Sequence, residues 1–303
     1  MKPAVRKLKG LITLGALVMM LFLAPLANAE NAGNLRGAFA SPSVEYSTAP
    51  LWVWNDMMSE EQVRQSLRDM ASQNVMQAFV HPRPGLMTPY LGEQWFAMWK
   101  VALDEAKKLG MRIWIYDENS YPSGFAGGFL GEVMPESRGR GLKFEEMEEV
   151  PTPLGENVLG VYRIEGDTSK NVTKEAAFPK ARYVVVRQDF APMGPWFAGK
   201  SNIDHLLPGA TEKFLEITLD ACKANFGEEF GKLVPGSFTD EPHLAVAGLH
   251  WTPDLPAVFQ KRWGYDLMDH LPSLHTEVGD WKRVRHNYLQ VINDLFIERW
   301  AKP

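Results

Sequence analysis

The sequence is poor in cysteine and has no surplus of positive charge. Its 303 residues include one cysteine, Cys222, and 32 lysines and arginines against 37 acidic residues, a formal net charge of -5. One cysteine can form no internal disulfide, so stability has to come from a packed core, which a 45% share of hydrophobic residues can supply. The acidic balance argues against the broad electropositive surface with which proteins bind nucleic acids. A phosphate site would need a glycine loop at a helix start or an arginine cluster, and the sequence shows neither.

The N-terminal segment has the pattern of an export signal. A basic leader precedes an apolar run at 11–23, and the small-residue triplet Ala27-Asn28-Ala29 follows. The run is short for a membrane span, and the triplet is typical of a signal-peptidase site. We therefore predict that residues 1–29 are a signal peptide cleaved near Ala29-Glu30. The mature protein is then periplasmic or secreted, with no stable membrane insertion; an uncleaved N-terminal anchor is the alternative.

Apolar segments alternate with amphipathic helices in the first part of the mature chain. Each of three short apolar runs is stopped by polar or proline residues, which predicts buried strands at 50–56, 75–85 and 111–118. The helix after the first run begins with a capping box formed by Ser59 and Gln62, and the next helix carries a tryptophan stripe. This alternation predicts right-handed parallel βα units.

The helical rhythm then stops and later returns. Short apolar segments joined by proline and glycine turns predict a β-rich insertion at 131–208. A helix capped by Thr211, a fourth strand at 233–242 and two further helical stretches follow. The prediction is an α/β protein with a (β/α)8 TIM-barrel-like fold, of whose eight βα units only about the first four are present. Residues 30–130 form its first half, and 209–303 form its apparently truncated continuation.

Charged side chains stand directly after the predicted strands. In a barrel these positions gather at one mouth, which is the active site. Paired carboxylates suit glycoside hydrolysis, where one carboxyl protonates the leaving oxygen and a second acts as nucleophile or activates water. We predict Glu241 and Glu118 as catalytic, with Glu241 as the general acid because apolar neighbours should raise its pKa. The predicted substrate-binding residues are Asp240, Asp117, His81, Arg83, Asp56, Trp54, Tyr121 and His243.

The same blocks carry a family resemblance. "WVWND", "IYDENSYPSGFAGG", "FTDEP" and "WTPDLPAVFQKRWGYDL" resemble the N-terminal catalytic part of bacterial glycosyl hydrolases that are similar to the α-L-rhamnosidases of glycoside hydrolase family 106. The resemblance implies a (β/α)8 barrel, export, and action on plant or microbial polysaccharide, so the expected partner is an oligo- or polysaccharide. The segment "NIDHLLPGATEKFLEIT" adds Asp204 as a candidate sugar ligand. The acidic motif of characterised rhamnosidases is missing, so sugar specificity does not carry over.

Several of these residues have a structural alternative. Asp117 and Glu118 could anchor the glycine-rich turn that follows them, and a buried His81 could bond a carbonyl. Arg83 could pair with either acid and hold it ionised. We expect no cofactor and no metal; calcium, which prefers oxygen ligands, is the alternative, although no metal-loop spacing is present.

Two other functions stay open. A metal-dependent barrel hydrolase would need several histidines at the strand ends, where only His81 and His243 are well placed. A non-catalytic carbohydrate-binding protein, or a truncated and inactive barrel, is the second alternative.

Overall fold

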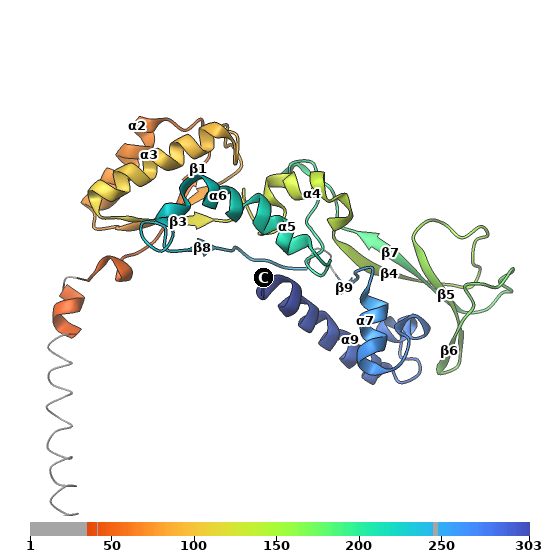
Figure 1. Cartoon of the computed structure of the whole chain (residues 1–303). Coiled ribbons are helices and arrows are strands. Elements are labelled where there is room, and N and C mark those ends of the chain that lie inside the picture. The colour runs from red at the N-terminus through yellow and green to blue at the C-terminus, as the bar shows by residue number, and fades with distance from the viewer. Residues whose placement is uncertain (1–34, 41, 245–247) are drawn as a thin grey trace, which may run out of the picture.

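The computed structural model describes residues 35–40, 42–244 and 248–303. A parallel sheet with its helices lies at one end of an elongated molecule, and an antiparallel sheet lies at the other end (Figure 1). The predicted signal peptide, residues 1–29, lies outside the described residues. Among the helices of the described part, none combines the length and the apolarity needed to cross a bilayer.

The parallel sheet has four strands in the order β1-β2-β3-β8. They are β1 (Leu51–Trp54), β2 (Gln77–Pro82), β3 (Arg112–Tyr116) and β8 (Ser237–Phe238). Every neighbouring pair is parallel, so the four predicted strands and their common direction are confirmed. A closed (β/α)8 barrel has eight such strands. In the described residues the four strands form an open sheet, and closure into a barrel stays a prediction.

The two helices between these strands begin and end as their sequence predicts. At the start of α2 (Glu60–Ser72), the Ser59 side chain accepts the Gln62 N–H, and the Gln62 side chain accepts the Ser59 N–H. Helix α3 (Glu93–Leu109) ends at Gly110, whose φ of 70° is a left-handed conformation that glycine adopts without steric cost. Both ends fix how the chain enters and leaves the sheet.

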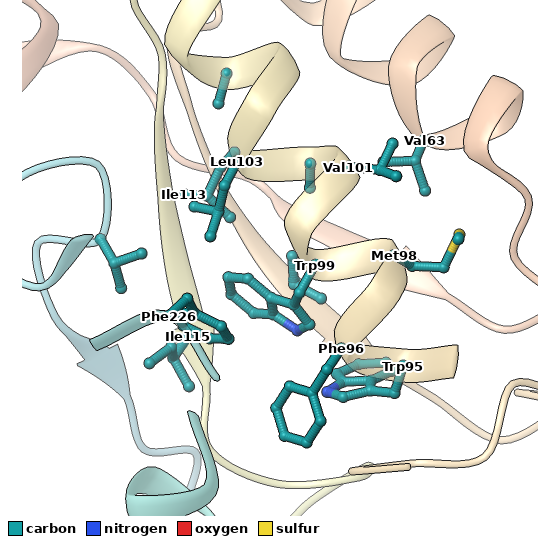
Figure 2. Close-up of a cluster of buried hydrophobic side chains, with 14 of the residues drawn as sticks. Val63, Trp95, Phe96, Met98, Trp99, Val101, Leu103, Ile113, Ile115 and Phe226 are labelled. Atoms are coloured by element: carbon teal, nitrogen blue, oxygen red, sulfur yellow. The ribbon is translucent and has the colours of Figure 1, made fainter. Parts of the chain in front are cut away.

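One face of the parallel sheet forms the core with α2, α3 and α6 (Leu219–Phe226). Figure 2 shows side chains of α3 beside Ile113 and Ile115 of β3 and Phe226 of α6. Trp99 stacks on Phe226 with a distance of 4.7 Å between ring centroids. Full burial of a large apolar side chain contributes roughly 1.5–3 kcal/mol, so this core holds the strands whose ends carry the candidate site.

The opposite face of the same sheet is apolar and more open. Leu51 and Val53 of β1 are 45% and 44% exposed, and Phe238 of β8 is 37% exposed. Phe79 lies between Trp114 and Phe238, with ring centroids 5.4 Å from each. Successive strand residues point to opposite faces, which places these side chains away from the helices. Parallel sheets are usually covered on both faces.

The antiparallel sheet has five strands in the order β6-β5-β7-β4-β9. They are β4 (Arg140–Met147), β5 (Val158–Glu165), β6 (Thr168–Asn171), β7 (Tyr183–Phe190) and β9 (Leu249–His250). Four of them come from the stretch 131–208, in which the sequence predicts a β-rich insertion, while β9 comes from a later part of the chain. The predicted division of the chain into domains stays a prediction.

The C-terminal helices pack on the antiparallel sheet. They are α7 (Leu255–Trp263), α8 (Leu271–His275) and α9 (Trp281–Phe296), which continues as the π-helix η7 (Ile297–Ala301). Their side chains Phe259, Leu274 and Tyr288 share one core with Tyr162 and Val184 of the sheet. The sequence interpretation assigned this part of 209–303 to the barrel. An apolar helix stripe predicts burial, but it does not say which sheet the stripe meets.

The predicted cap at Thr211 is wrong. Helix α5 (Ala210–Ile217) begins after Gly209, whose φ is 84°, and Thr211 is a buried residue of its first turn. The predicted single helix is also divided. Thr218 separates α5 from α6, and its hydroxyl bonds the Phe214 carbonyl at 2.8 Å, a local bond that competes with regular helix geometry.

Short helical segments complete the chain. They are η1 (Val44–Tyr46), η2 (Ala126–Gly128), α4 (Phe129–Val133), η3 (Pro135–Ser137), η4 (Pro195–Phe197), η5 (Gly227–Glu229) and η6 (Leu267–Asp269).

Candidate functional site

The ends of the four parallel strands meet at one edge of the sheet, as predicted. Backbone hydrogen bonds join the neighbouring ends: Arg83 N–H to Trp54 O (3.0 Å), Ser120 N–H to Pro82 O (3.0 Å), Asp117 N–H to Phe238 O (3.2 Å) and Ser123 N–H to Asp240 O (2.8 Å). The acidic residues after β3 and β8 therefore belong to one group of side chains, which we call the strand-end site. The roles of its members stay predictions.

Asp117 and Asp240 are linked through the hydroxyl group of Ser123. The Ser123 hydroxyl donates to Asp117 Oδ1 at 2.5 Å and accepts the Asp240 N–H at 2.9 Å. The Thr239 hydroxyl donates to Asp117 Oδ2 at 2.5 Å. The Tyr116 hydroxyl donates to Asp240 Oδ2. Both carboxylates are therefore held in fixed orientations by groups from β3, β8 and the loops after them.

The two aspartates differ in their access to solvent. Asp117 is 3% exposed, and burial raises its pKa to about 6; the nearby Asp240 charge acts in the same direction, while the Ser123 and Thr239 hydroxyls oppose it. Asp240 is half-buried. Of the two, Asp240 is the carboxylate that a bound molecule can reach, and Asp117 supports it from behind.

Glu118 anchors the loop that follows it. Its side chain is fully buried, and its two oxygens accept four backbone N–H groups: Asn119 (2.8 Å), Gly124 (3.1 Å), Ala126 (2.7 Å) and Gly127 (2.5 Å). This arrangement does not support a catalytic role, because neither oxygen is left for a substrate. The structural alternative for Glu118 is the one that the contacts favour.

The protonation of Glu118 is set by opposing effects. Burial raises its pKa to about 8, while the N–H donors lower it because they bond the ionised form. A protonated carboxyl would need an acceptor for its own hydrogen, and all four neighbours are donors. The four donors of the loop therefore fit the ionised carboxylate.

Glycines allow the loop to wrap around Glu118. Gly124, Gly127 and Gly128 have φ values of 136°, 62° and 98°, which side chains rarely allow. A Cβ on Gly124 would lie 2.7 Å from His205 Nε2. His205 is fully buried and bonds the Ser123 carbonyl at 3.0 Å through Nε2, and burial lowers its pKa to about 4. The loop that positions Ser123 is thus supported from the segment before α5.

His81 and Arg83 lie beside the acidic pair, but the structural alternative for Arg83, an ion pair with Asp117 or Glu118, is not formed. Arg83 Nη1 is 3.3 Å from His81 Nε2, and its guanidinium lies over the Tyr121 ring at 5.0 Å. His81 is 1% exposed, and burial, followed by the Arg83 charge, lowers its pKa to about 4. His81 is therefore neutral near pH 7, and its ring contacts Tyr116 with centroids 3.8 Å apart.

Glu241 lies in a different setting from the one predicted. Its side chain is exposed, and its backbone φ is 46°, a left-handed value that is uncommon outside glycine. The apolar surroundings that the sequence predicted for Glu241 are not formed, because its side chain is exposed and Phe238 is itself 37% exposed. His243 is also exposed, and its Nδ1 is 2.9 Å from the Glu241 carbonyl.

Three predicted substrate ligands have contacts outside the linked aspartate pair. Trp54 is 0% exposed and packs against Trp95 in the core, so it cannot form a pocket wall. Asp204 is 5% exposed; its Oδ1 accepts the Leu206 N–H, and its Oδ2 lies 3.6 Å from Arg140. Asp56 is exposed and bonds the N–H of its own neighbour, Met57, at 2.7 Å. The contacts of Trp54 and Asp204 are structural ones.

Several members of the site were missed by sequence reasoning. Ser123 and Thr239 are adjacent to the acidic blocks, and their hydroxyls could have been suspected there. Trp196 of η4 is 75 residues from Tyr121, yet its indole N–H donates to the Tyr121 carbonyl at 2.5 Å. The two rings form an edge-to-face pair with centroids 5.2 Å apart. No local pattern signals such a contact between the insertion and the loop after β3.

A small pocket lies at the strand-end site, and a wider hollow lies away from it. A pocket of about 130 Å³ lies at the strand ends between the loops after β2 and β3 and η4. A wider hollow of about 560 Å³ lies along α3, α6 and η5, and no residue that follows a parallel strand lines it. In the described residues, no three histidine, cysteine, aspartate or glutamate side chains gather as a metal site.

The comparisons with known proteins give likeness in structure but not in sequence. No family model and no curated protein matches the chain. The chain is similar to the solved structure of a rhamnosidase from Novosphingobium sp. PP1Y, with a TM-score of 0.57 and 14% sequence identity. The likeness covers 88% of this chain and 45% of that chain, so the chain spans less than half of the rhamnosidase's length. At this identity the likeness shows a rhamnosidase-like fold.

Proposed function

We propose that the chain is the catalytic part of an exported glycoside hydrolase, rhamnosidase-like in its fold, that cleaves glycosidic bonds of plant or microbial polysaccharide. The observation that carries the proposal is the pair of linked aspartates at the converging strand ends. The fold likeness to a rhamnosidase supports cleavage of glycosidic bonds, and the N-terminal sequence pattern supports export.

The proposed chemistry assigns different tasks to the acids of the strand-end site. Asp240 meets the substrate, because it is half-buried and oriented by the Tyr116 hydroxyl. Asp117 lies behind it, and burial, together with the nearby Asp240 charge, raises the pKa of Asp117 to about 6, so that Asp117 can hold a proton near neutral pH. Glu241, exposed on the next residue, serves as the second carboxylate that glycoside hydrolysis requires.

Hydrolysis assays with matched variants test this proposal. The chain is incubated with a panel of aryl glycosides that includes an α-L-rhamnopyranoside, and reducing-sugar release is followed on polysaccharides. Asp240→Asn and Glu241→Gln should each lower turnover by a factor of about 100 or more, as loss of an acid–base group does. Glu61→Gln, which changes an exposed acid on α2, should leave turnover unchanged.

Two results would overturn the proposal. Sugar binding without any hydrolysis would favour the alternative of a carbohydrate-binding protein. Wild-type turnover in both Asp240→Asn and Glu241→Gln would remove these acids from the reaction.

A further inference from the structure

The pocket of about 130 Å³ at the strand ends, which we call the Arg83 pocket, has the features of an anion site. Its lining includes Arg83, Leu86, Asn119, Ser120, Phe125 and Trp196. A water molecule occupies about 30 Å³ in the liquid, so the pocket has room for roughly four waters. It can take one substituent of a sugar ring, with the ring itself extending outward.

The positive charge of Arg83 is not balanced by a neighbouring carboxylate. Its Nη1 is occupied by His81, a neutral side chain, and its face lies on the Tyr121 ring. Within the described residues, no carboxylate forms an ion pair with it, in contrast to Arg299, which pairs with Asp254 at 2.6 Å. Glu118 lies behind the same loop, but its oxygens are turned to backbone N–H groups.

The free edge of Arg83 has the geometry that a carboxylate fits. With Nη1 used by His81, Nε and Nη2 remain, and these two donors lie side by side on the planar guanidinium. Parallel N–H donors of this kind bind a carboxylate through both of its oxygens. A planar carboxylate therefore matches the unpaired side of Arg83.

Ser120 and Trp196 supply further contacts for a sugar. Ser120 is 2% exposed, and in the described part of the chain its hydroxyl has no hydrogen-bond partner, although it lines the pocket. Buried hydroxyls usually have a partner, so this one is available to a bound group. Trp196 is 40% exposed, and its indole is oriented by the bond to Tyr121. Its apolar surface offers a platform beside the pocket.

The Arg83 pocket is connected to the proposed cleavage position. Arg83 contacts His81, the His81 ring packs on Tyr116, and the Tyr116 hydroxyl bonds Asp240. A ligand group on Arg83 therefore lies a short chain of side chains away from Asp240. The pocket and Asp240 are thus joined by three successive side-chain contacts at the same edge of the sheet.

We propose that the Arg83 pocket binds the carboxylate of a uronic acid, and that the substrates are acidic oligosaccharides in which a uronate adjoins the cleaved bond. The claim that an acidic oligosaccharide is the substrate rests on the proposed function. The binding of a uronate to the Arg83 pocket does not depend on it. Arg83 fixes the carboxylate, Ser120 bonds the sugar, and Trp196 covers one of its faces.

Calorimetric titration tests the binding directly. Glucuronate and galacturonate are compared with their methyl esters, which have the same ring without the charge. Each acid should bind about tenfold or more tightly than its ester, within the range of a charge-assisted hydrogen bond, and the difference should shrink at high salt. Arg83→Gln should abolish the difference. Arg83→Lys should keep part of it, since lysine supplies the charge without the planar fork.

The control variant is Lys174→Gln, which removes the same charge from an exposed position in the insertion and should bind the acids as the wild type does. Thermal unfolding of Arg83→Gln should match the wild type, so that loss of binding is not loss of folding. Equal affinity for acid and ester would overturn the inference. Displacement of the uronate by inorganic sulfate at the same concentration would also overturn it, because the pocket would then be a simple anion site.

Hydrolysis separates this inference from the proposed function. Uronate binding that depends on Arg83, in a chain that cleaves nothing, would leave the inference intact and refute the function. Cleavage of neutral glycosides, with no preference for acidic ones and no change in Arg83→Gln, would support the proposed function and refute the inference.

Discussion

Replacing Glu118 by glutamine should destabilise the fold, because the loop after β3 is built around a carboxylate. In Glu118→Gln one oxygen becomes an NH2 group, which cannot accept the two N–H groups that face it. The lost pair is Asn119 and Gly127, or Gly124 and Ala126, depending on how the amide is turned. Each buried N–H left without an acceptor costs about 1–3 kcal/mol, so the free energy of unfolding should fall by about 2–6 kcal/mol.

Such a loss is a large part of the 5–15 kcal/mol typical of a folded domain. Urea unfolding at pH 7, followed by tryptophan fluorescence, measures it, and hydrogen exchange of the amides at 119–127 should show that protection is lost first in this loop. Glu61→Gln, on the exposed side of α2, should stay within about 0.5 kcal/mol of the wild type. If Glu118 were protonated at pH 7, glutamine would imitate it. A Glu118→Gln variant as stable as the wild type, with unchanged exchange, would therefore refute the reasoning.

Two further predictions concern buried rings. Burial lowers the pKa of His205 to about 4, below the ordinary 6.5, so the stability that depends on neutral His205 is present above pH 6.5 and is lost as pH falls toward 4. Between pH 7 and pH 5 this effect should lower the free energy of unfolding, measured with urea, by about 1–2 kcal/mol. In His205→Gln this part of the pH dependence should be absent. An equal fall in the wild type and in His205→Gln would contradict the prediction. Trp54→Phe should lower the free energy of unfolding by about 1–3 kcal/mol without changing sugar affinity, because Trp54 is 0% exposed. Calorimetric titration measures the affinity, and a weaker binding of sugar by Trp54→Phe would contradict this prediction.

The parallel sheet was predictable because its signals are local. Each strand is an apolar run with a polar or proline stop, and the helix between the first two has a capping box at Ser59 that the structure reproduces. The same local signals failed at Thr211, because the helix begins two residues earlier than predicted, after a glycine in a left-handed conformation. They also gave no information on which sheet the C-terminal helices cover, since that choice depends on the shape and apolar surface of both sheets together.

The location of the site could be predicted, but the roles of its members could not. Strand ends converge in every parallel βα fold, which is why the acids after β3 and β8 were expected together. The sequence does not show burial, and burial decides whether an acid can act. Glu118 is fully buried and bonded to its own loop, whereas Glu241 is exposed. Trp196 could not be found from sequence, because its partner Tyr121 lies 75 residues away.

The two acids of each adjacent pair, Asp117–Glu118 and Asp240–Glu241, have different contacts because consecutive side chains beyond a strand end point in different directions. After β3, Asp117 turns toward the neighbouring strand end and orients Ser123 and Thr239, while Glu118 turns into its own loop. After β8, Asp240 is held by Tyr116 and Glu241 extends into solvent. A buried carboxylate is tolerated only where donors surround it, and the glycine-rich loop supplies four of them to Glu118. The first pair therefore builds the frame of the site, and the second is the one that remains free to meet a ligand.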